Sequence, residues 1–166
     1  MRYNPYWFND QGLPTNNLLH IIWEIESNLK KFKDYSIFVV GSNARGDWRS
    51  NEDLIKIRDL IEKAKKGLLS EEEITYLSKF YNYGEIENYF LDSSHRYYLD
   101  PSKMNVSDLD LKILGINRRY WFNLANKLCF EKTPNNYWNG LVHVILSDIL
   151  IKPYFDIRKG WFFEDF

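Results

Sequence analysis

Two acidic residues separated by a single residue form the first chemically suggestive pattern in this sequence. Asp108 and Asp110 belong to residues 107–114, where polar and apolar residues alternate as in a half-buried strand. Successive side chains of a strand point to opposite faces, so both carboxylates should project to one side together with Lys112. Two such carboxylates repel each other when buried alone, but they can hold one or two hard cations such as Mg²⁺. The pattern predicts a metal site or a solvated position, with Lys112 solvated or paired at the sheet.

A turn of small residues is the second suggestive feature. Residues 35–40 are mostly apolar and β-branched, which predicts a buried strand, and they run directly into Gly41–Asp47, with the sequence GSNARGD. Backbone N–H groups at such a turn, with the first residues of a following helix, can cradle a phosphate. Carboxylates that hold Mg²⁺ beside a phosphate cradle are suited to phosphoryl or nucleotidyl transfer.

Further elements must position these two motifs. The N-terminal arm, residues 1–14, should be pinned to the body by Tyr6, Trp7 and Phe8. In chain order we then expect a helix over 15–33, the strand over 35–40, the strand over 107–114, a helix over 117–131, a turn over 133–136, a strand over 141–146, and a tail with a short helix and an aromatic end. This order predicts an α/β (α+β) fold in a single domain over residues 1–166.

Residues 48–106 have a different character and are predicted to form a helical insertion. Helices are expected over 50–66 and 70–81, each opened by a capping box, Ser-x-x-Asp or Ser-x-x-Glu, with a third helical stretch as far as Leu91. The insertion carries nine basic and eleven acidic residues, which argues against a strong nucleic-acid clamp. Its aromatic residues are interpreted as core rather than as base-stacking platforms. A lid, a partner-binding arm and a scaffold all remain possible roles.

The two motifs together resemble the signature of the polymerase-β-like nucleotidyltransferase superfamily. Phe38-Val-Val-Gly-Ser-Asn-Ala-Arg-Gly-Asp47 and Ser107-Asp-Leu-Asp-Leu111 each fall on a predicted strand and occur in the family's order. The similarity is greatest to the minimal nucleotidyltransferases, whose turn commonly reads Gly-Ser-x-Ala-Arg-Gly. The resemblance extends over the N-terminal helix and the second half of the chain. It implies a nucleotidyltransferase fold: a small mixed β-sheet flanked by helices, here with the helical insertion.

The resemblance also implies roles for individual residues. Gly41 and Ser42 would contact a nucleoside triphosphate, and Asp108 and Asp110 would bind Mg²⁺ or Mn²⁺. The metals would align the α-phosphate with an attacking hydroxyl and stabilise the pyrophosphate leaving group. Arg45 would approach phosphate or, as an equal alternative, make a surface salt bridge or a helix-end contact. Lys112 is interpreted as solvated or paired at the sheet rather than as a nucleotide contact.

Two departures from the family pattern affect this interpretation. The Gly-Ser turn and the Asp-x-Asp strand lie close together in the minimal family, whereas 66 positions separate Ser42 from Asp108. The family's third carboxylate, in the next strand, is matched here by His143. That imidazole could ligate Mn²⁺ or Zn²⁺, act as a general base toward the incoming hydroxyl, or be a hydrogen-bonded histidine in a site without activity. Asp148 is a possible substitute carboxylate or a helix cap.

The function implied is metal-dependent transfer of a nucleoside monophosphate, AMP from ATP, to a hydroxyl. Minimal relatives are often antitoxins that modify a partner toxin, and no second domain for a small acceptor is evident, so a protein acceptor is favoured. An antibiotic or an RNA end remains open as acceptor. The alternative is a degenerate member that binds a nucleotide or a protein partner without turnover, which His143 supports. A third hypothesis assigns the main function to the insertion, as an interaction arm.

Composition limits the remaining classes. The 22 basic and 23 acidic residues nearly cancel, so nothing global attracts the chain to nucleic acid or to an anionic membrane. A single cysteine, Cys129, excludes an internal disulfide and a multi-cysteine zinc site, and it is interpreted as a buried thiol. No signal-peptide pattern or membrane-spanning apolar run is found, which predicts a cytoplasmic protein without membrane contact. His20 and His95 lack partner spacing and are taken as structural or surface residues.

Overall fold

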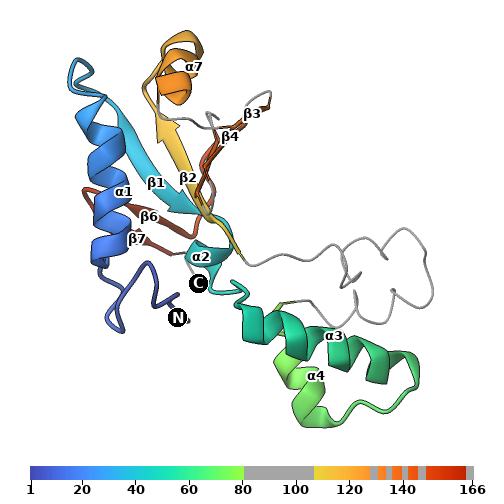
Figure 1. The fold of residues 1–166 in the computed structure, drawn as a ribbon. Helices are drawn as coiled ribbons and strands as arrows, with labels where there is room; N and C mark the ends of the chain where they lie inside the picture. The colour runs from blue at the N-terminus through green and yellow to red at the C-terminus, as the bar shows by residue number, and fades with distance from the viewer. Residues whose placement is uncertain (81–106, 128–130, 134–135, 140–141, 146–148, 164–166) are drawn as a thin grey trace. The chain divides into compact units, whose positions relative to one another are not determined.

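The chain divides into two compact units. The computed structural model describes residues 1–80, 107–127, 131–133, 136–139, 142–145 and 149–163. One unit joins Met1–Gly46 to Asp108–Phe166, and the other is Asp47–Ser107, close to the residues of the predicted insertion. The first unit contains the sheet and the helices α1 (Asn16–Ser27), α2 (Ser42–Arg45) and α7 (Arg118–Lys127), and the second contains α3 (Asn51–Lys65) and α4 (Glu71–Leu77) (Figure 1).

The first unit is a mixed α+β structure built on one sheet. The strands described are β1 (Ser36–Val40), β2 (Leu109–Leu114), β3 (Glu131–Thr133), β4 (Asn136–Asn139), β5 (Val142–Ile145), β6 (Tyr154–Asp156) and β7 (Gly160–Phe162). They form a seven-stranded sheet in the order β3-β4-β5-β2-β1-β6-β7. β2 and β5 run parallel and the other neighbours run antiparallel, so the sheet is mixed.

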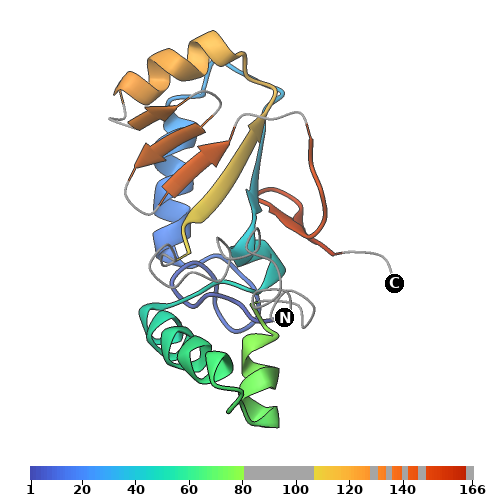
Figure 2. The same ribbon diagram turned by 90° about the vertical axis from the view of Figure 1, so that its right-hand side faces the viewer.

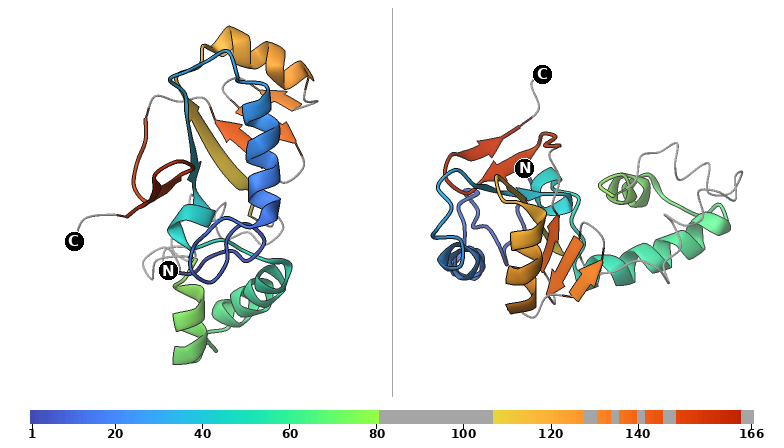
Figure 3. Two further views of the ribbon diagram at one scale, coloured as in Figure 1. Left: turned by 90° about the vertical axis from the view of Figure 1, so that its left-hand side faces the viewer. Right: turned by 90° about the horizontal axis from the view of Figure 1, so that it is seen from above.

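The two faces of the sheet differ in chemistry. The apolar positions of the central strands face α1 and α7, and the members of this core include Val39, Leu111, Val144, Ile22 and Trp121. Figure 2 shows α1 behind the central strands, and the opposite view in Figure 3 places it in front of them. Alternate positions of β2 and β5 point to the other face and are only half-buried. The strand pleat thus places the chemically suggestive residues on the face away from the core.

The N-terminal arm is fixed to the sheet by aromatic contacts, as predicted. Trp7 and Phe8 are buried, and the ring of Phe8 lies 5.0 Å from that of Trp161, measured between centroids. The indole Nε1 of Trp161 donates a hydrogen bond to the Gly12 carbonyl oxygen at 2.8 Å. The prediction is wrong for Tyr6, whose side chain is 51% exposed.

The end of the first unit differs from the prediction. Where a short helix was expected in the tail, β6 and β7 form an antiparallel hairpin. Asp156 Oδ1 accepts hydrogen bonds from the N–H groups of Arg158 and Lys159, which is the Asx-type pattern that closes a turn rather than starting a helix. Gly160 follows with φ of 96°, a conformation that favours glycine.

Two further boundaries were also missed. The first helix ends at Ser27 rather than Lys33, although Leu29 remains buried beyond it. The predicted turn at 133–136 lies between two short strands, β3 and β4, which the sequence did not indicate. β4 pairs along its length with β5, so its extended conformation depends on a neighbour from elsewhere in the chain.

The second unit contains the two predicted capping boxes. The hydroxyl of Ser50 accepts the Asp53 N–H, and Asp53 accepts the Ser50 N–H; Ser70 and Glu73 make the same reciprocal pair. α3 and α4 share a small core of Leu54, Ile57, Leu60, Ile61 and Leu77, against which Tyr76 and Phe80 pack. The core interpretation is confirmed for these two aromatics. The third helical stretch, His95, Cys129 and Asp148 lie outside the described residues. Within the described part of the chain, no helix is long and apolar enough to cross a membrane.

Candidate functional site

The small-residue turn and the Asp-x-Asp strand meet in the structure. Val40, the last residue of β1, lies opposite Asp110 in the antiparallel register of β1 and β2. Gly41 follows with φ of 70° and ψ of −151°, a region of backbone conformation that is essentially restricted to glycine. A Cβ at this position would collide with Asp110 Oδ2. Glycine is therefore required here both by the backbone and by the carboxylate packed against it.

The helix that follows the turn is short. α2 has only four residues and is ended by Gly46, whose φ is 90°. One helical turn has little dipole, so α2 adds little of the anion attraction expected from the sequence. Its contribution is to carry Arg45, which lines a cavity beside the turn.

Asp110 has a neighbour on the next strand, the histidine that the family resemblance had singled out. The parallel register of β2 and β5 pairs Asp110 with His143, and Oδ1 of Asp110 lies 3.0 Å from Nδ1 of His143. The two side chains are 24% and 14% exposed, respectively. His143 thus occupies the place beside Asp110 where the family resemblance implies a carboxylate. Among the described residues, Asp110 Oδ2 has no hydrogen bond or ion pair, and it faces the turn at Gly41.

Asp108 is placed differently from Asp110. It lies just before β2 and is half-buried, and its carbonyl oxygen accepts a hydrogen bond from Asn43 Nδ2 at 2.7 Å. Of the two predicted carboxylates, only Asp110 lines the cavity, and Ser42 lies outside the lining as well. The structure therefore brings Gly41, Arg45 and Asp110 together at the cavity. His143 contacts Asp110 from outside the lining, and Ser42 and Asp108 are adjacent to these residues in sequence.

Asn43 is a positioning residue that sequence reasoning missed. It is fully buried, and its Oδ1 accepts a hydrogen bond from Asn4 Nδ2 at 2.9 Å while its Nδ2 donates to Asp108. An amide can donate and accept at once, so it connects the N-terminal arm, the turn and the entry to β2. The sequence feature that could have indicated this role is the polar asparagine at the variable position of the Gly-Ser-x-Ala-Arg-Gly turn.

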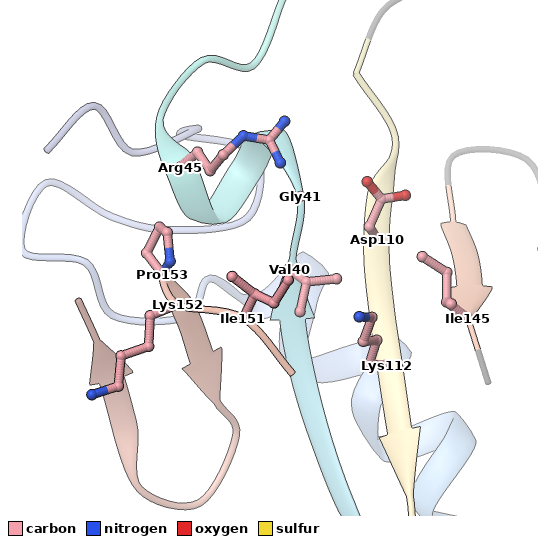
Figure 4. A pocket seen from close by; sticks show the side chains of 9 residues that line it. All are labelled: Val40, Gly41, Arg45, Asp110, Lys112, Ile145, Ile151, Lys152 and Pro153. Carbon is pink, nitrogen blue, oxygen red and sulfur yellow. The ribbon is translucent and has the colours of Figure 1, made fainter. Parts of the chain in front are cut away.

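The cavity itself has a volume of about 320 Å³ and lies on the face of the sheet away from the core. The residues that line it are Val40, Gly41, Arg45, Asp110, Lys112, Ile145, Ile151, Lys152 and Pro153 (Figure 4). Three of these side chains are basic and one is acidic, so the lining carries a net positive charge. The apolar residues among them limit solvent screening, which strengthens the attraction for an anion.

The three basic side chains are oriented differently. In Figure 4 the guanidinium of Arg45 is turned toward Gly41 and Asp110, whereas the Lys152 side chain extends away from Asp110. Lys112 is paired at the sheet, as predicted: its Nζ donates a hydrogen bond to the Ile149 carbonyl oxygen at 2.6 Å. Because this partner is a neutral carbonyl, the positive charge of Lys112 is not cancelled by it.

Asp110 is suited to hold a cation that takes its remaining ligands from a bound substrate and from water. In the described part of the chain, no three histidine, cysteine, aspartate or glutamate side chains gather as a metal-binding group. Mg²⁺, however, is commonly held by one or two carboxylates together with substrate phosphates and water. Asp110 Oδ2 fits such a role, since the other oxygen is already held by His143. His143 therefore acts first as the hydrogen-bond partner of this carboxylate.

Comparison with known proteins gives no relative from which a function could be carried over to this chain. No family model, curated protein or solved structure matches this chain. His20, at the exposed surface of α1, lies away from the cavity lining, as expected from its spacing.

Proposed function

We propose that this chain is a metal-dependent nucleotidyltransferase that transfers AMP from ATP to a hydroxyl group, with a protein as the favoured acceptor. The observation that carries the proposal is the contact between the Gly41 turn and the Asp110 carboxylate at the edge of a cavity with basic residues. Polyphosphate transfer needs a carboxylate for a divalent cation beside groups that bind phosphate. The resemblance to the nucleotidyltransferase superfamily, with its implied fold, rests on the same two motifs.

The side chains have separate tasks in this proposal. Gly41 lets backbone approach the phosphates, and Arg45 supplies positive charge next to it. Asp110 would hold the cation through Oδ2, with its orientation set by His143. A bound Mg²⁺ or Mn²⁺ would neutralise phosphate charge and stabilise the departing pyrophosphate.

In the transfer step, the acceptor oxygen forms a bond to the α-phosphorus while the bond from that phosphorus to the pyrophosphate oxygen breaks. The proton of the acceptor hydroxyl passes to His143, the proposed general base. An imidazole whose other nitrogen is held by a carboxylate is well oriented for this task. Pyrophosphate leaves with the electron pair of the broken bond.

Labelled nucleotides test the proposal directly. The protein is incubated in host lysate with ATP, GTP, CTP or UTP labelled at the α-phosphate, each with Mg²⁺ or Mn²⁺. Wild type and Asp10→Ala, which changes an exposed carboxylate of the same unit, should transfer label from ATP to one macromolecule. Asp110→Ala should reduce the transfer by about 100-fold or more. Undiminished transfer by Asp110→Ala would refute the assignment.

Nucleotide binding without turnover is the second candidate. The observation in its favour is that His143, rather than an acidic residue, faces Asp110. In this case ATP with Mg²⁺ or Mn²⁺ should raise the melting temperature of the wild type through binding to the folded state, and Asp110→Ala should abolish the shift. Binding of this kind without label transfer under either metal would identify the second candidate.

A further inference from the structure

Lys112 places a second charged group on the sheet wall of the cavity. It follows Asp110 by two positions on β2, so both side chains project from the same face. Their Cα atoms are about 7 Å apart along the strand, two rises of roughly 3.4 Å. Figure 4 shows the ammonium of Lys112 between β2 and the side chains of Val40 and Ile151, which also line the cavity.

The hydrogen bonding of Lys112 leaves it able to bind a ligand. An ammonium has three N–H donors, and in the described part of the chain the Ile149 carbonyl accepts from one of them. The same hydrogen bond fixes the chain at Ile149, close to Ile151 and Pro153, which form another part of the lining. Lys112 is therefore held in place by one donor while the other two remain for an anion.

The dimensions of the cavity suit part of a nucleotide. Its volume of about 320 Å³ is at the lower end of the range for small-molecule sites. Ile151 lines the cavity yet is 71% exposed, so the cavity opens to solvent at this residue. A phosphate chain fits within these walls, and the remainder of the nucleotide can extend through the opening.

We propose that Lys112 binds the β- and γ-phosphates of a nucleoside triphosphate and makes the site selective for phosphate-chain length. This assignment of Lys112 rests on the proposed function, because it assumes that the α-phosphate lies beside Asp110. From there, a phosphate chain directed along β2 reaches Lys112. Charge-assisted hydrogen bonds to phosphate are stronger than neutral ones, and the apolar walls reduce their screening.

Affinity as a function of phosphate number tests this assignment. Dissociation constants for AMP, ADP, ATP and inorganic pyrophosphate are measured by calorimetry at one ionic strength, with Mn²⁺ and with EDTA. Lys112→Gln should weaken ATP and pyrophosphate binding by about 10- to 100-fold and AMP binding by less than about 3-fold. Lys159→Gln is the matched control, because it removes the same charge from an exposed residue of the same unit that does not line the cavity. It should change all four constants by less than about 3-fold.

A structural role for Lys112 gives a different result. If its only task were to hold Ile149, Lys112→Gln would weaken AMP and ATP binding equally, and this would overturn the proposal. Equal losses in Lys112→Gln and Lys159→Gln would overturn it as well. Lys112→Arg, which keeps the charge and the donors, should restore the preference for ATP over AMP.

A measurement on the wild type does not depend on the folding of any variant. Amine acetylation followed by mass spectrometry should show that pyrophosphate and ATP protect Lys112, whereas AMP does not, and that the exposed Lys159 stays reactive throughout. Unchanged acetylation of Lys112 with pyrophosphate would overturn the proposal. Transfer of label together with pyrophosphate binding that does not depend on Lys112 would support the transferase function and overturn the role of Lys112. Lys112-dependent pyrophosphate binding without transfer of label would support the role of Lys112 and count against the transferase function.

Discussion

Substitution of Gly41 by alanine tests the contact on which the site depends. The change adds one methyl group at a position with φ of 70° and ψ of −151°. The added Cβ would meet Asp110 Oδ2, so that carboxylate must move. Its movement would break the 3.0 Å contact between Asp110 and His143.

The expected loss of stability has two parts. Holding a non-glycine residue in this conformation costs about 1–3 kcal/mol. Loss of the Asp110–His143 hydrogen bond costs about 0.5–1.5 kcal/mol more. Together these effects should lower the free energy of unfolding by about 2–4 kcal/mol. Nucleotide binding should fall with it, because a displaced Asp110 carboxylate can no longer hold the cation in the proposed position.

Gly160→Ala is the matched control for this experiment. Gly160 lies in the same unit with φ of 96°, but a Cβ there would meet nothing within 4 Å. Its substitution should cost about 1–2 kcal/mol from backbone strain alone and leave nucleotide affinity unchanged. Urea denaturation measures both variants, and calorimetry with ATP measures binding.

A double-mutant cycle separates the cost of backbone strain at position 41 from the cost of the collision between the added Cβ and Asp110. In an Asp110→Ala background, the Oδ2 atom is gone, so Gly41→Ala should cost about 1 kcal/mol less than in the wild type. The reasoning would be refuted if Gly41→Ala were no less stable than Gly160→Ala and bound ATP as the wild type does. An unchanged cost in the Asp110→Ala background would refute the proposed collision.

Three further predictions follow from other contacts. Asn43→Ala should lower the free energy of unfolding by about 1–3 kcal/mol in urea, because it removes two hydrogen bonds of a fully buried side chain, one to the Asp108 carbonyl oxygen and one from the Asn4 amide; a loss below about 0.5 kcal/mol would contradict this. The hydrogen bond from Lys63, followed by a backbone N–H, holds the pKa of Glu73 below its ordinary value of 4.5, so ionised Glu73 stabilises the folded state above that pH and the effect is lost as the pH falls below it. Glu73→Gln should therefore flatten the fall in urea midpoint between pH 6 and pH 3, and identical pH profiles would count against the pairing. His143→Asp should lower the ratio of Mn²⁺- to Mg²⁺-supported label transfer, because a second carboxylate beside Asp110 could help to hold Mg²⁺; an unchanged ratio would show that the residue at position 143 does not set the metal preference.

Local patterns in the sequence predicted many of the elements. Both capping boxes are present because a hydroxyl and a carboxylate three residues apart satisfy the first helical N–H groups without help from the rest of the chain. The β1 strand was predicted from its run of β-branched and apolar residues, and β2 from its alternation of polar and apolar residues, both of which are local properties. The tail was predicted less well: its strands are three residues each, too short for periodicity to distinguish from a helix.

In the candidate site, too, some features were predictable from the sequence and others depended on the tertiary structure. The residue types and their places on strands singled out the Gly41 turn and Asp110, and the family resemblance carried by these motifs added Arg45 and His143. Tertiary structure decided that Asp110 and His143 lie 3.0 Å apart, and that Lys112 and Arg45 line one cavity while Asp108 does not. Strand order and register set these distances, and they depend on pairing between residues far apart in the chain. The role of Asn43 could only be seen in the structure, because both of its hydrogen-bond partners come from distant segments.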